Sequence, residues 1–117
     1  MKAFGDADVF DDDRGSLLAL ELAEVPFPVR RVFVVTGRSG GSDRGDHVVP
    51  CSEAIVLLSG SASFRATLSS TGEEVEARLA RRGQRLHLER GDHVSYRLAD
   101  ERSAILVLAE EPFEADR

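Results

Sequence analysis

Apolar and polar residues alternate along most of the chain, so that apolar side chains recur at every second position. A period of two places these side chains on one face of a β-strand. Such alternating sets occur at Leu18, Leu20 and Leu22; Val32, Val34 and Thr36; Phe64, Ala66 and Leu68; and Val75, Ala77 and Leu79. Ala104–Ala109 is instead a continuous apolar run, typical of a strand covered on both faces. The pattern predicts roughly eight to ten short strands separated by Gly, Ser, Asp and Pro.

The predicted connections are short, and no long helix is expected. Glu73–Arg82 is the best helix candidate between Leu17 and Ala109, but its alternation favours a strand. Ser69–Gly72 has the composition of a hairpin loop. Gly37–Gly45 is glycine-rich and is expected to be either a flexible mouth loop or a plain linker turn. Met1–Phe10 is a possible first strand, of a kind that small barrels often exchange between the subunits of a dimer.

Composition narrows the possible classes of protein. The chain has 117 residues, which predicts one domain over residues 1–117. Its net charge of −6 and the absence of a basic stripe argue against nucleic-acid binding. It has no apolar run long enough to cross a membrane, and its acidic N-terminus lacks an apolar core, so a cytoplasmic location is expected. Cys51 is the single cysteine, which excludes an internal disulfide. Residues 110–117 form an acidic tail.

Two stretches keep the spacing of the two metal-binding motifs of cupins. The first runs from Gly41 through His47 and Glu53 to Gly60, with Val49 in place of the second histidine of the motif. The resemblance implies an all-β, single-domain cupin with a jelly-roll barrel, also called a double-stranded β-helix.

The second stretch runs from Gly83 through Glu89 and Gly91 to Leu98, with Val94 in place of the motif's histidine. Of the three histidines and one glutamate that a cupin metal site uses, His47 and Glu53 remain. Valine has no lone pair, and two ligands do not make a metal site of the usual kind. We therefore predict that the protein binds no metal and needs no cofactor.

A narrower resemblance comes from an ordered set of short segments. These are Asp13–Leu17, Val25–Phe27, Arg31–Phe33, Arg44–His47 and Gly60–Ser61. In this order and spacing they resemble the sugar-nucleotide 3,4-ketoisomerases, which act on dTDP-4-keto-6-deoxyglucose. The resemblance covers most of residues 13–109 and is strongest before Gly60. It implies a metal-independent, homodimeric isomerase of deoxysugar or natural-product biosynthesis.

The resemblance also implies roles for individual residues. The first histidine of the family's catalytic His-x-His pair corresponds to His47, and the second corresponds to Val49. The family's tyrosine falls at Phe33 or Val34, neither of which ionises. The chain is thus a divergent member that lacks the second catalytic histidine.

Several residues are candidates for the proton transfer that the missing second histidine would perform. Moving a carbonyl through an enediol requires one or two groups that transfer protons near neutral pH. Besides His47, the candidates are Glu53, Cys51 and Tyr96, and the sequence does not choose among them. A second set is expected to bind the substrate: Arg44, Arg31, Phe33, Val49 and Cys51. Arg44 suits a diphosphate because a guanidinium binds it with two parallel hydrogen bonds.

Two histidines have weaker claims. His93 lies one residue before the second metal position and is predicted to point outward. His87 alternates with Leu86 and Leu88 and is predicted to lie on the surface or at an edge.

The altered positions leave other functions open. The chain is either an isomerase-like enzyme or a non-catalytic cupin that binds a small molecule. A third possibility is a cyclase or lyase of secondary metabolism with an apolar pocket, because valines inside the barrel suit an apolar ligand.

Overall fold

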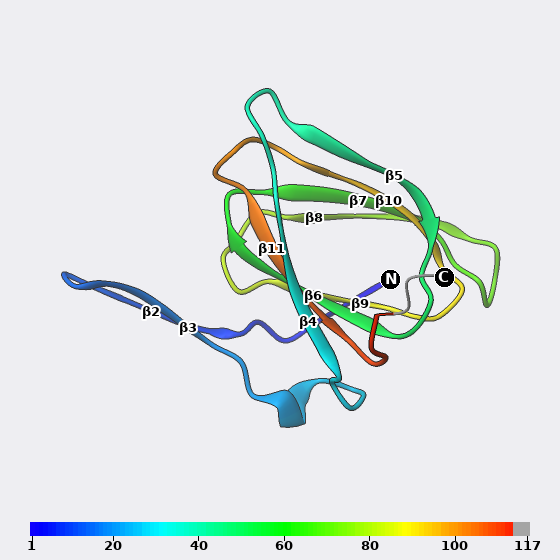
Figure 1. The fold of residues 1–117 in the computed structure, drawn as a ribbon, viewed down its shortest axis with the longest axis horizontal. Helices are drawn as coiled ribbons and strands as arrows, with labels where there is room; N and C mark the ends of the chain where they lie inside the picture. The colour runs from blue at the N-terminus through cyan, green and yellow to red at the C-terminus, as the bar shows by residue number, and fades with distance from the viewer. Residues whose placement is uncertain (114–117) are drawn as a thin grey trace.

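The computed structural model describes residues 1–113 and contains two antiparallel sheets that face each other (Figure 1). The five-stranded sheet has the order β1-β9-β6-β11-β4. Its strands are β1 (Lys2–Phe4), β9 (Arg85–Leu88), β6 (Glu53–Ser59), β11 (Ala104–Ala109) and β4 (Arg31–Thr36). The four-stranded sheet has the order β5-β10-β7-β8. Its strands are β5 (Ser42–Val48), β10 (His93–Leu98), β7 (Ala62–Thr67) and β8 (Glu74–Leu79).

From β4 to β11 the chain passes repeatedly from one sheet to the other, as in a jelly roll. The predicted all-β fold is therefore confirmed, with eleven strands rather than eight to ten. The hairpin loop predicted at Ser69–Gly72 joins β7 to β8, and the helix candidate at Glu73–Arg82 contains strand β8. No helix among the described residues is long and apolar enough to cross a membrane.

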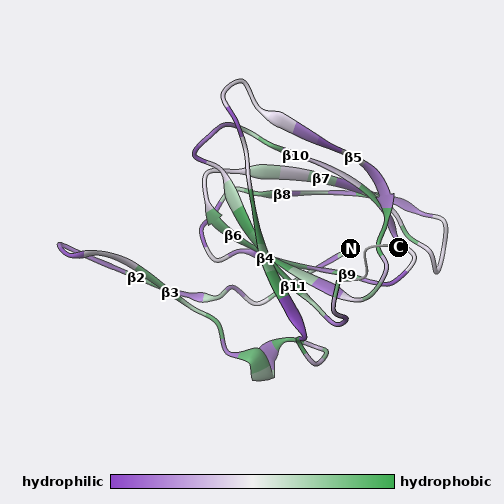
Figure 2. Ribbon diagram, in the orientation of Figure 1, coloured by the Kyte–Doolittle hydropathy of each residue, from purple (hydrophilic) through white to green (hydrophobic). Residues whose placement is uncertain are grey.

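The main core lies between the two sheets and explains the alternating sequence. The five-stranded sheet contributes Ile55, Leu57 and Ile105, and the four-stranded sheet contributes Phe64 and Leu98, all at most 3% exposed. In Figure 2 hydrophobic residues gather on β4, β6 and β11, while β5 is mostly hydrophilic. Burial of one face of each strand is what fixes its register, because a shift by one residue would expose every apolar side chain.

A second apolar cluster covers the outer face of the five-stranded sheet. Phe27 and Val25, from the segment after the 3-10 turn η1 (Leu22–Glu24), pack there on Val56 and Leu108. This explains why Ala104–Ala109 is apolar throughout: β11 has one core on each side. Arg85 ties the N-terminal segment to the same face, since its side chain donates hydrogen bonds to the carbonyl oxygens of Gly5 and Asp6.

The N-terminal segment differs from its prediction. Met1–Phe10 is not one strand: β1 ends at Phe4, and β2 (Asp8–Asp12) belongs to a hairpin with β3 (Gly15–Ala19). This hairpin projects from the body of the molecule (Figure 1). Likewise the predicted mouth loop is shorter than Gly37–Gly45, because β5 already begins at Ser42. The predicted acidic tail, 110–117, lies partly outside the described residues.

Candidate active site

A bulge in the four-stranded sheet brings three predicted site residues to its inner face. His47 lies opposite Val94, and Arg44 lies opposite Tyr96, with a register shift between the two pairs. Residues opposite each other in antiparallel strands point to the same side. Since Val94 belongs to the main core, His47, Arg44 and Tyr96 all lie on the inner side of the sheet, where Tyr96 is partly buried and His47 and Arg44 stay exposed. Without the bulge, Arg44 and His47, three residues apart, would point to opposite sides.

The five-stranded sheet adds a carboxylate and a guanidinium on the facing side. Glu53 alternates with core residues on β6 and is 9% exposed, so it points inward. Ala109 of β11 lies between Glu53 and Arg31, opposite both. The backbones at Glu53 and Arg31 are therefore two strand spacings apart, or about 10 Å. Phe33 follows two residues after Arg31 and packs against the main core.

The electrostatics connect Tyr96 with both sheets. Burial raises the pKa of the Tyr96 phenol above its usual value of 10.0. The Arg44 charge lowers this pKa and offsets part of the effect, whereas the Glu53 carboxylate raises it. The ring stacks on Phe64 with centroids 5.0 Å apart. Tyr96 is therefore a neutral phenol near pH 7, suited to donate a proton or a hydrogen bond rather than to act as a base.

Arg31 and the aromatic residues around it mark one end of the candidate site. Its guanidinium lies over the rings of Phe33 and Phe113, at 4.4 and 4.8 Å from their centroids. Such cation–π contacts hold an arginine in one orientation while leaving its N–H groups free for hydrogen bonds. No feature of the sequence pointed to Phe113, which lies in the segment predicted to be an acidic tail.

Two predicted substrate-binding residues lie deeper. Val49 is fully buried in the main core, and its backbone pairs with Gly91 and Asp92 beside β10. Cys51 is a free thiol that is 2% exposed. Both are therefore more deeply buried than His47 and Arg44, which are exposed.

The other two histidines lie away from this group. His93 is exposed and lies opposite Val48, which is 60% exposed, so the predicted outward direction is confirmed. His87 does point away from Leu86 and Leu88, but its predicted surface position is wrong. The second apolar cluster half buries it, its ring lies 5.7 Å from Phe27, and its Nε2 has no hydrogen-bond partner.

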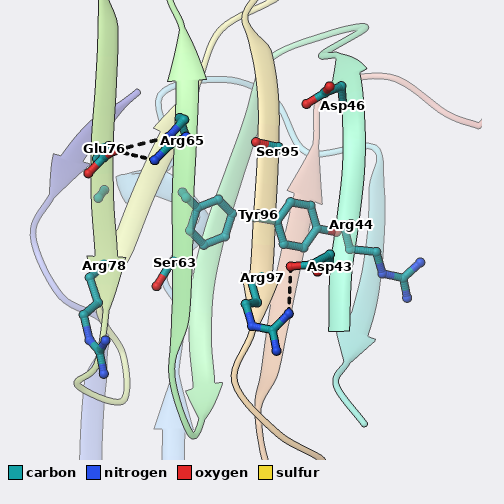
Figure 3. Close-up of a pocket in the computed structure, with 12 residues that line it drawn as sticks. Asp43, Arg44, Asp46, Ser63, Arg65, Glu76, Arg78, Ser95, Tyr96 and Arg97 are labelled. Atoms are coloured by element: carbon teal, nitrogen blue, oxygen red, sulfur yellow. Dashed lines mark hydrogen bonds and ion pairs between the residues drawn. The ribbon is translucent and has the colours of Figure 1, made fainter. Parts of the chain in front are cut away.

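A concavity of about 730 Å³ lies on the outer face of the four-stranded sheet (Figure 3). Two of the arginines that line it are in ion pairs: Arg65 pairs with Glu76 at 2.9 Å, and Arg97 pairs with Asp43 at 2.8 Å. Both pairs are exposed to water, where the net attraction is small. This face therefore behaves as an ordinary solvated sheet surface, and the chemistry gathers on the opposite face.

Among residues 1–113, no group of three or more His, Cys, Asp and Glu side chains is placed to hold a metal ion. At the cupin motif positions, Val94 is 1% exposed and Val49 is fully buried, so apolar packing occupies the space of two ligands. His47 and Glu53 are the two motif ligands that remain on the inner faces.

Comparisons with known proteins identify relatives of this chain. The family model FdtA, described as WxcM-like, C-terminal, matches residues 3–117. No curated protein sequence matches the chain.

Several solved structures have the same fold. The TDP-quinovose 3,4-ketoisomerase WlaRB from Campylobacter jejuni is 25% identical, with a TM-score of 0.77 over 94% of this chain and 85% of that chain. The sugar 3,4-ketoisomerase QdtA from Thermoanaerobacterium thermosaccharolyticum, in complex with TDP, is 22% identical, with a TM-score of 0.76 over 95% and 81%. The 3'-monoepimerase ChmJ from Streptomyces bikiniensis is 16% identical, with a TM-score of 0.76 over 97% and 65%. The last two, at lower identity, are likenesses of fold.

Proposed function

Because the chain belongs to the FdtA family (WxcM-like, C-terminal), we propose that it is an isomerase-like cupin that acts on a nucleotide-linked 4-keto-6-deoxy sugar. The family match across residues 3–117 is the observation that carries this proposal. The 3,4-ketoisomerase named among its structural relatives supports the type of reaction. The inward-facing group of His47, Glu53, Tyr96 and Arg44 provides side chains of the kind that such a reaction needs.

The proposed reaction conserves all atoms. A base takes the proton from C3, the carbonyl oxygen at C4 takes up a proton, and an enediol forms. The hydroxyl at C3 then becomes the new carbonyl, and C4 receives a proton. Two functions are needed, a base for the carbon protons and a donor for the oxygen that carries negative charge.

We assign these functions according to charge and position. His47 is the base, because an imidazole titrates close to neutral pH and this one faces the interior. Tyr96, held neutral by its raised pKa, donates to the carbonyl oxygen. Glu53 stands where a carboxylate can take the role of the missing second histidine. The buried position of Cys51 makes it the weaker replacement.

Exchange of solvent deuterium at C3 of a 4-keto-6-deoxy sugar nucleotide tests the isomerase proposal. The wild-type protein is expected to catalyse exchange even if net conversion is slow, since enolisation comes first. No exchange at high protein concentration would exclude the proposal.

One observation favours a second candidate, a non-catalytic binding protein or a lyase-type enzyme with an apolar pocket. Val49 and Val94 place apolar side chains where the cupin motifs have ionisable ones, and both are buried. Thermal shift with nucleoside diphosphates against polyketide-like compounds separates the two candidates, because a ligand that binds only the folded state raises the melting temperature, and does so more as its concentration exceeds its Kd.

We also propose a homodimer. The hairpin β2–β3 projects from the body (Figure 1), and Phe10 and Leu17, opposite each other on it, are 61% and 57% exposed. Val32 and Val34 on edge strand β4 are 56% and 54% exposed. Apolar side chains on an unpaired edge favour pairing with a second chain. Light scattering should give twice the mass of the chain, and Phe10→Ser with Leu17→Ser should reduce it to one.

Metal independence and a cytoplasmic setting complete the proposal. Valines at motif positions 49 and 94 support metal independence. Elemental analysis of protein purified without added metal tests this property. A free cysteine is common in reducing compartments, which agrees with a cytoplasmic setting.

A further inference from the structure

The segment that follows β11, residues 110–113, turns back toward one end of the candidate site, and we call it the strap. The chain bends at Glu110 and Glu111, directly after β11 ends (Figure 1). Pro112 comes next, and its ring fixes one backbone angle and restricts the residue before it. Phe113 then lies against Arg31, on the strand beside β11.

The strap is held in place by contacts that do not involve Phe113. The N–H of Glu110 donates to the carbonyl oxygen of Ser52 at 3.0 Å, next to β6. The carbonyl oxygen of Glu110 accepts a hydrogen bond from the Arg30 side chain at 3.1 Å, next to β4. Glu111 forms an ion pair with Arg90, from the turn between β9 and β10. Contacts to three separate parts of the fold therefore determine where the strap lies.

Burial of apolar surface does not explain the position of Phe113. Its ring is 65% exposed and belongs to neither of the two apolar clusters. The centroid of this ring lies 4.8 Å from the Arg31 guanidinium. The same guanidinium lies 4.4 Å from the centroid of Phe33, which packs against the main core. Arg31 therefore contacts one ring fixed by the core and one ring carried by the strap.

These two contacts restrict the Arg31 side chain on the inner side of the sheet. Arg31 and Glu53 both lie opposite Ala109, which places them on the same side. An aromatic ring attracts a guanidinium through the face of the ring, and the N–H groups of the guanidinium stay available for hydrogen bonds. A long side chain loses rotational freedom when it binds a ligand. A guanidinium that is already oriented loses less, and its affinity for a ligand is higher.

A second arginine of the same sheet makes the same type of contact in a structural setting. Arg85 lies over the ring of Phe4 at 4.6 Å, on the outer face. It is 2% exposed, and its side chain donates hydrogen bonds to the carbonyl oxygens of Gly5 and Asp6. Arg31 is only partly buried, so a ligand can reach its guanidinium.

We propose that Phe113 is a positioning residue, which together with Phe33 holds the Arg31 guanidinium in the orientation that binds the substrate. The strap thereby forms part of one end of the candidate site. The identity of the substrate, a nucleotide-linked 4-keto-6-deoxy sugar, rests on the proposed function. The orientation of Arg31 in the free protein does not depend on turnover and can be measured separately.

Binding of dTDP-4-keto-6-deoxyglucose, measured by calorimetry, tests the role of the ring. Phe113→Leu keeps an apolar side chain but removes the aromatic face, and it should weaken binding about threefold, as expected for an exposed cation–π contact. Phe113→Trp should bind at least as tightly as the wild-type protein, because indole attracts cations most strongly. Phe4→Leu is the matched control, since it removes the same type of contact on the outer face, and it should leave the affinity unchanged.

Two further readouts separate positioning from catalysis and from folding. In the deuterium-exchange assay, Phe113→Leu should raise KM and leave kcat unchanged, because the ring supports binding and not proton transfer. The melting temperature should stay at the wild-type value, because the ring is largely exposed. A lower melting temperature with unchanged affinity would show a purely structural role and overturn the proposal.

The Arg31→Gln background shows whether the ring acts through Arg31. In this background Phe113→Leu should have no further effect on affinity, because no guanidinium is left to hold. A loss as large as in the wild-type background would show that the ring contacts the ligand directly, which would overturn the positioning role.

A measurement on the free protein tests the proposal whatever the affinity for the ligand. The NMR order parameter of the Arg31 Nε–Hε bond should fall in Phe113→Leu and stay unchanged in Phe4→Leu. The same order parameter in Phe113→Leu and in the wild-type protein would overturn the proposal.

Failure of this inference and failure of the proposed function give different results. Deuterium exchange together with unchanged affinity in Phe113→Leu would remove only the positioning role. Binding that depends on Phe113 in a protein without exchange would remove the isomerase proposal and leave the positioning role intact. No binding of dTDP-4-keto-6-deoxyglucose to the wild-type protein would overturn both.

Discussion

The two faces of the four-stranded sheet carry similar charged residues, but those residues behave differently. On the outer face, Arg65 pairs with Glu76 and Arg97 pairs with Asp43, in water. On the inner face, the charges of Arg44 and Glu53 act on the partly buried phenol of Tyr96 and change its pKa in opposite directions. Charge interactions are stronger where water is excluded. Ionisable groups that face an apolar interior are therefore a better guide to the site than the larger outer concavity.

The strongest contrast between the faces is expected in catalysis. His47 and His93 each follow a Gly-Asp step, but they point to opposite faces of the same sheet. His47→Asn should reduce deuterium exchange at least about 100-fold, because general base catalysis contributes that much or more. His93→Asn, the matched control, should change the rate less than about twofold. Equal effects from both substitutions would remove the distinction between the two faces.

Two neighbouring residues on β7 allow the inner and outer faces of the sheet to be compared for their contribution to stability. Phe64 stacks on Tyr96 inside the core, and Arg65, the next residue, is exposed outside. Phe64→Ala should lower the free energy of unfolding by about 3–5 kcal/mol, and Arg65→Ala by less than about 0.5 kcal/mol. Urea denaturation of the two variants measures both values. A loss above about 1 kcal/mol for Arg65→Ala would mean that the outer ion pairs stabilise the fold more than exposed pairs usually do.

Restoring the family's residues sharpens the comparison on the inner face. Val49→His with Phe33→Tyr returns two ionisable groups to the interior, and exchange should increase if the pocket otherwise keeps the family's geometry. Because Val49 is fully buried, the imidazole should also lower the melting temperature. Val48→His is the control, because Val48 is the exposed neighbour of Val49. It should change neither the exchange rate nor the melting temperature. A folded double variant with unchanged exchange would favour a pocket adapted to another ligand.

A smaller effect, on the pH dependence of stability, is expected from His87. This residue lies on the outer face of the five-stranded sheet, which the N-terminal segment covers. Burial lowers the pKa of this imidazole below its usual 6.5, with smaller opposing effects from Glu89, Asp92 and Glu110. The folded state therefore resists protonation, and stability is full above pH 6.5 and falls as the pH drops below it. The carboxylates with lowered pKa, such as Asp6 and Asp92, lose their contribution only below their usual 3.8, in a separate range.

Unfolding measured between pH 7.5 and 5 in the wild-type protein and in His87→Gln tests this effect. The variant should show a flatter dependence on pH, since glutamine does not titrate. The same slope in both proteins would show that another group causes the loss.

The sequence predicted the strands well wherever burial was the deciding factor. Phe64, Ala66 and Val75 alternate with exposed residues because each strand has one face in the core, and Ala104–Ala109 is apolar because it has two. The alternation at Leu18–Leu22 misled, since β3 ends at Ala19 and Leu22 begins a 3-10 turn. Local alternation does not reveal where a strand loses its hydrogen-bonding partner.

The candidate site was predictable residue by residue but not as an arrangement. Motif spacing identified His47 and Glu53, and Tyr96 was one of several candidates among which the sequence did not choose. The bulge, at which Gly45 and Asp46 of β5 face Ser95 of β10, turns Arg44 inward, and a single glycine does not show from the sequence that a strand gains a residue there.

The electrostatic link of Tyr96 with Glu53 and Arg44 is central to the candidate site, and the chain offers a direct way to measure it. Tyr96 is the single tyrosine and there is no tryptophan, so the ultraviolet absorbance of the phenolate reports on this residue alone. Alkaline titration should give a pKa above 10.0 in the wild-type protein, a lower one in Glu53→Gln and a higher one in Arg44→Gln. Glu76→Gln, on the outer face, should leave it unchanged. A Tyr96 pKa that is normal in the wild-type protein, or equal in all four proteins, would contradict the account.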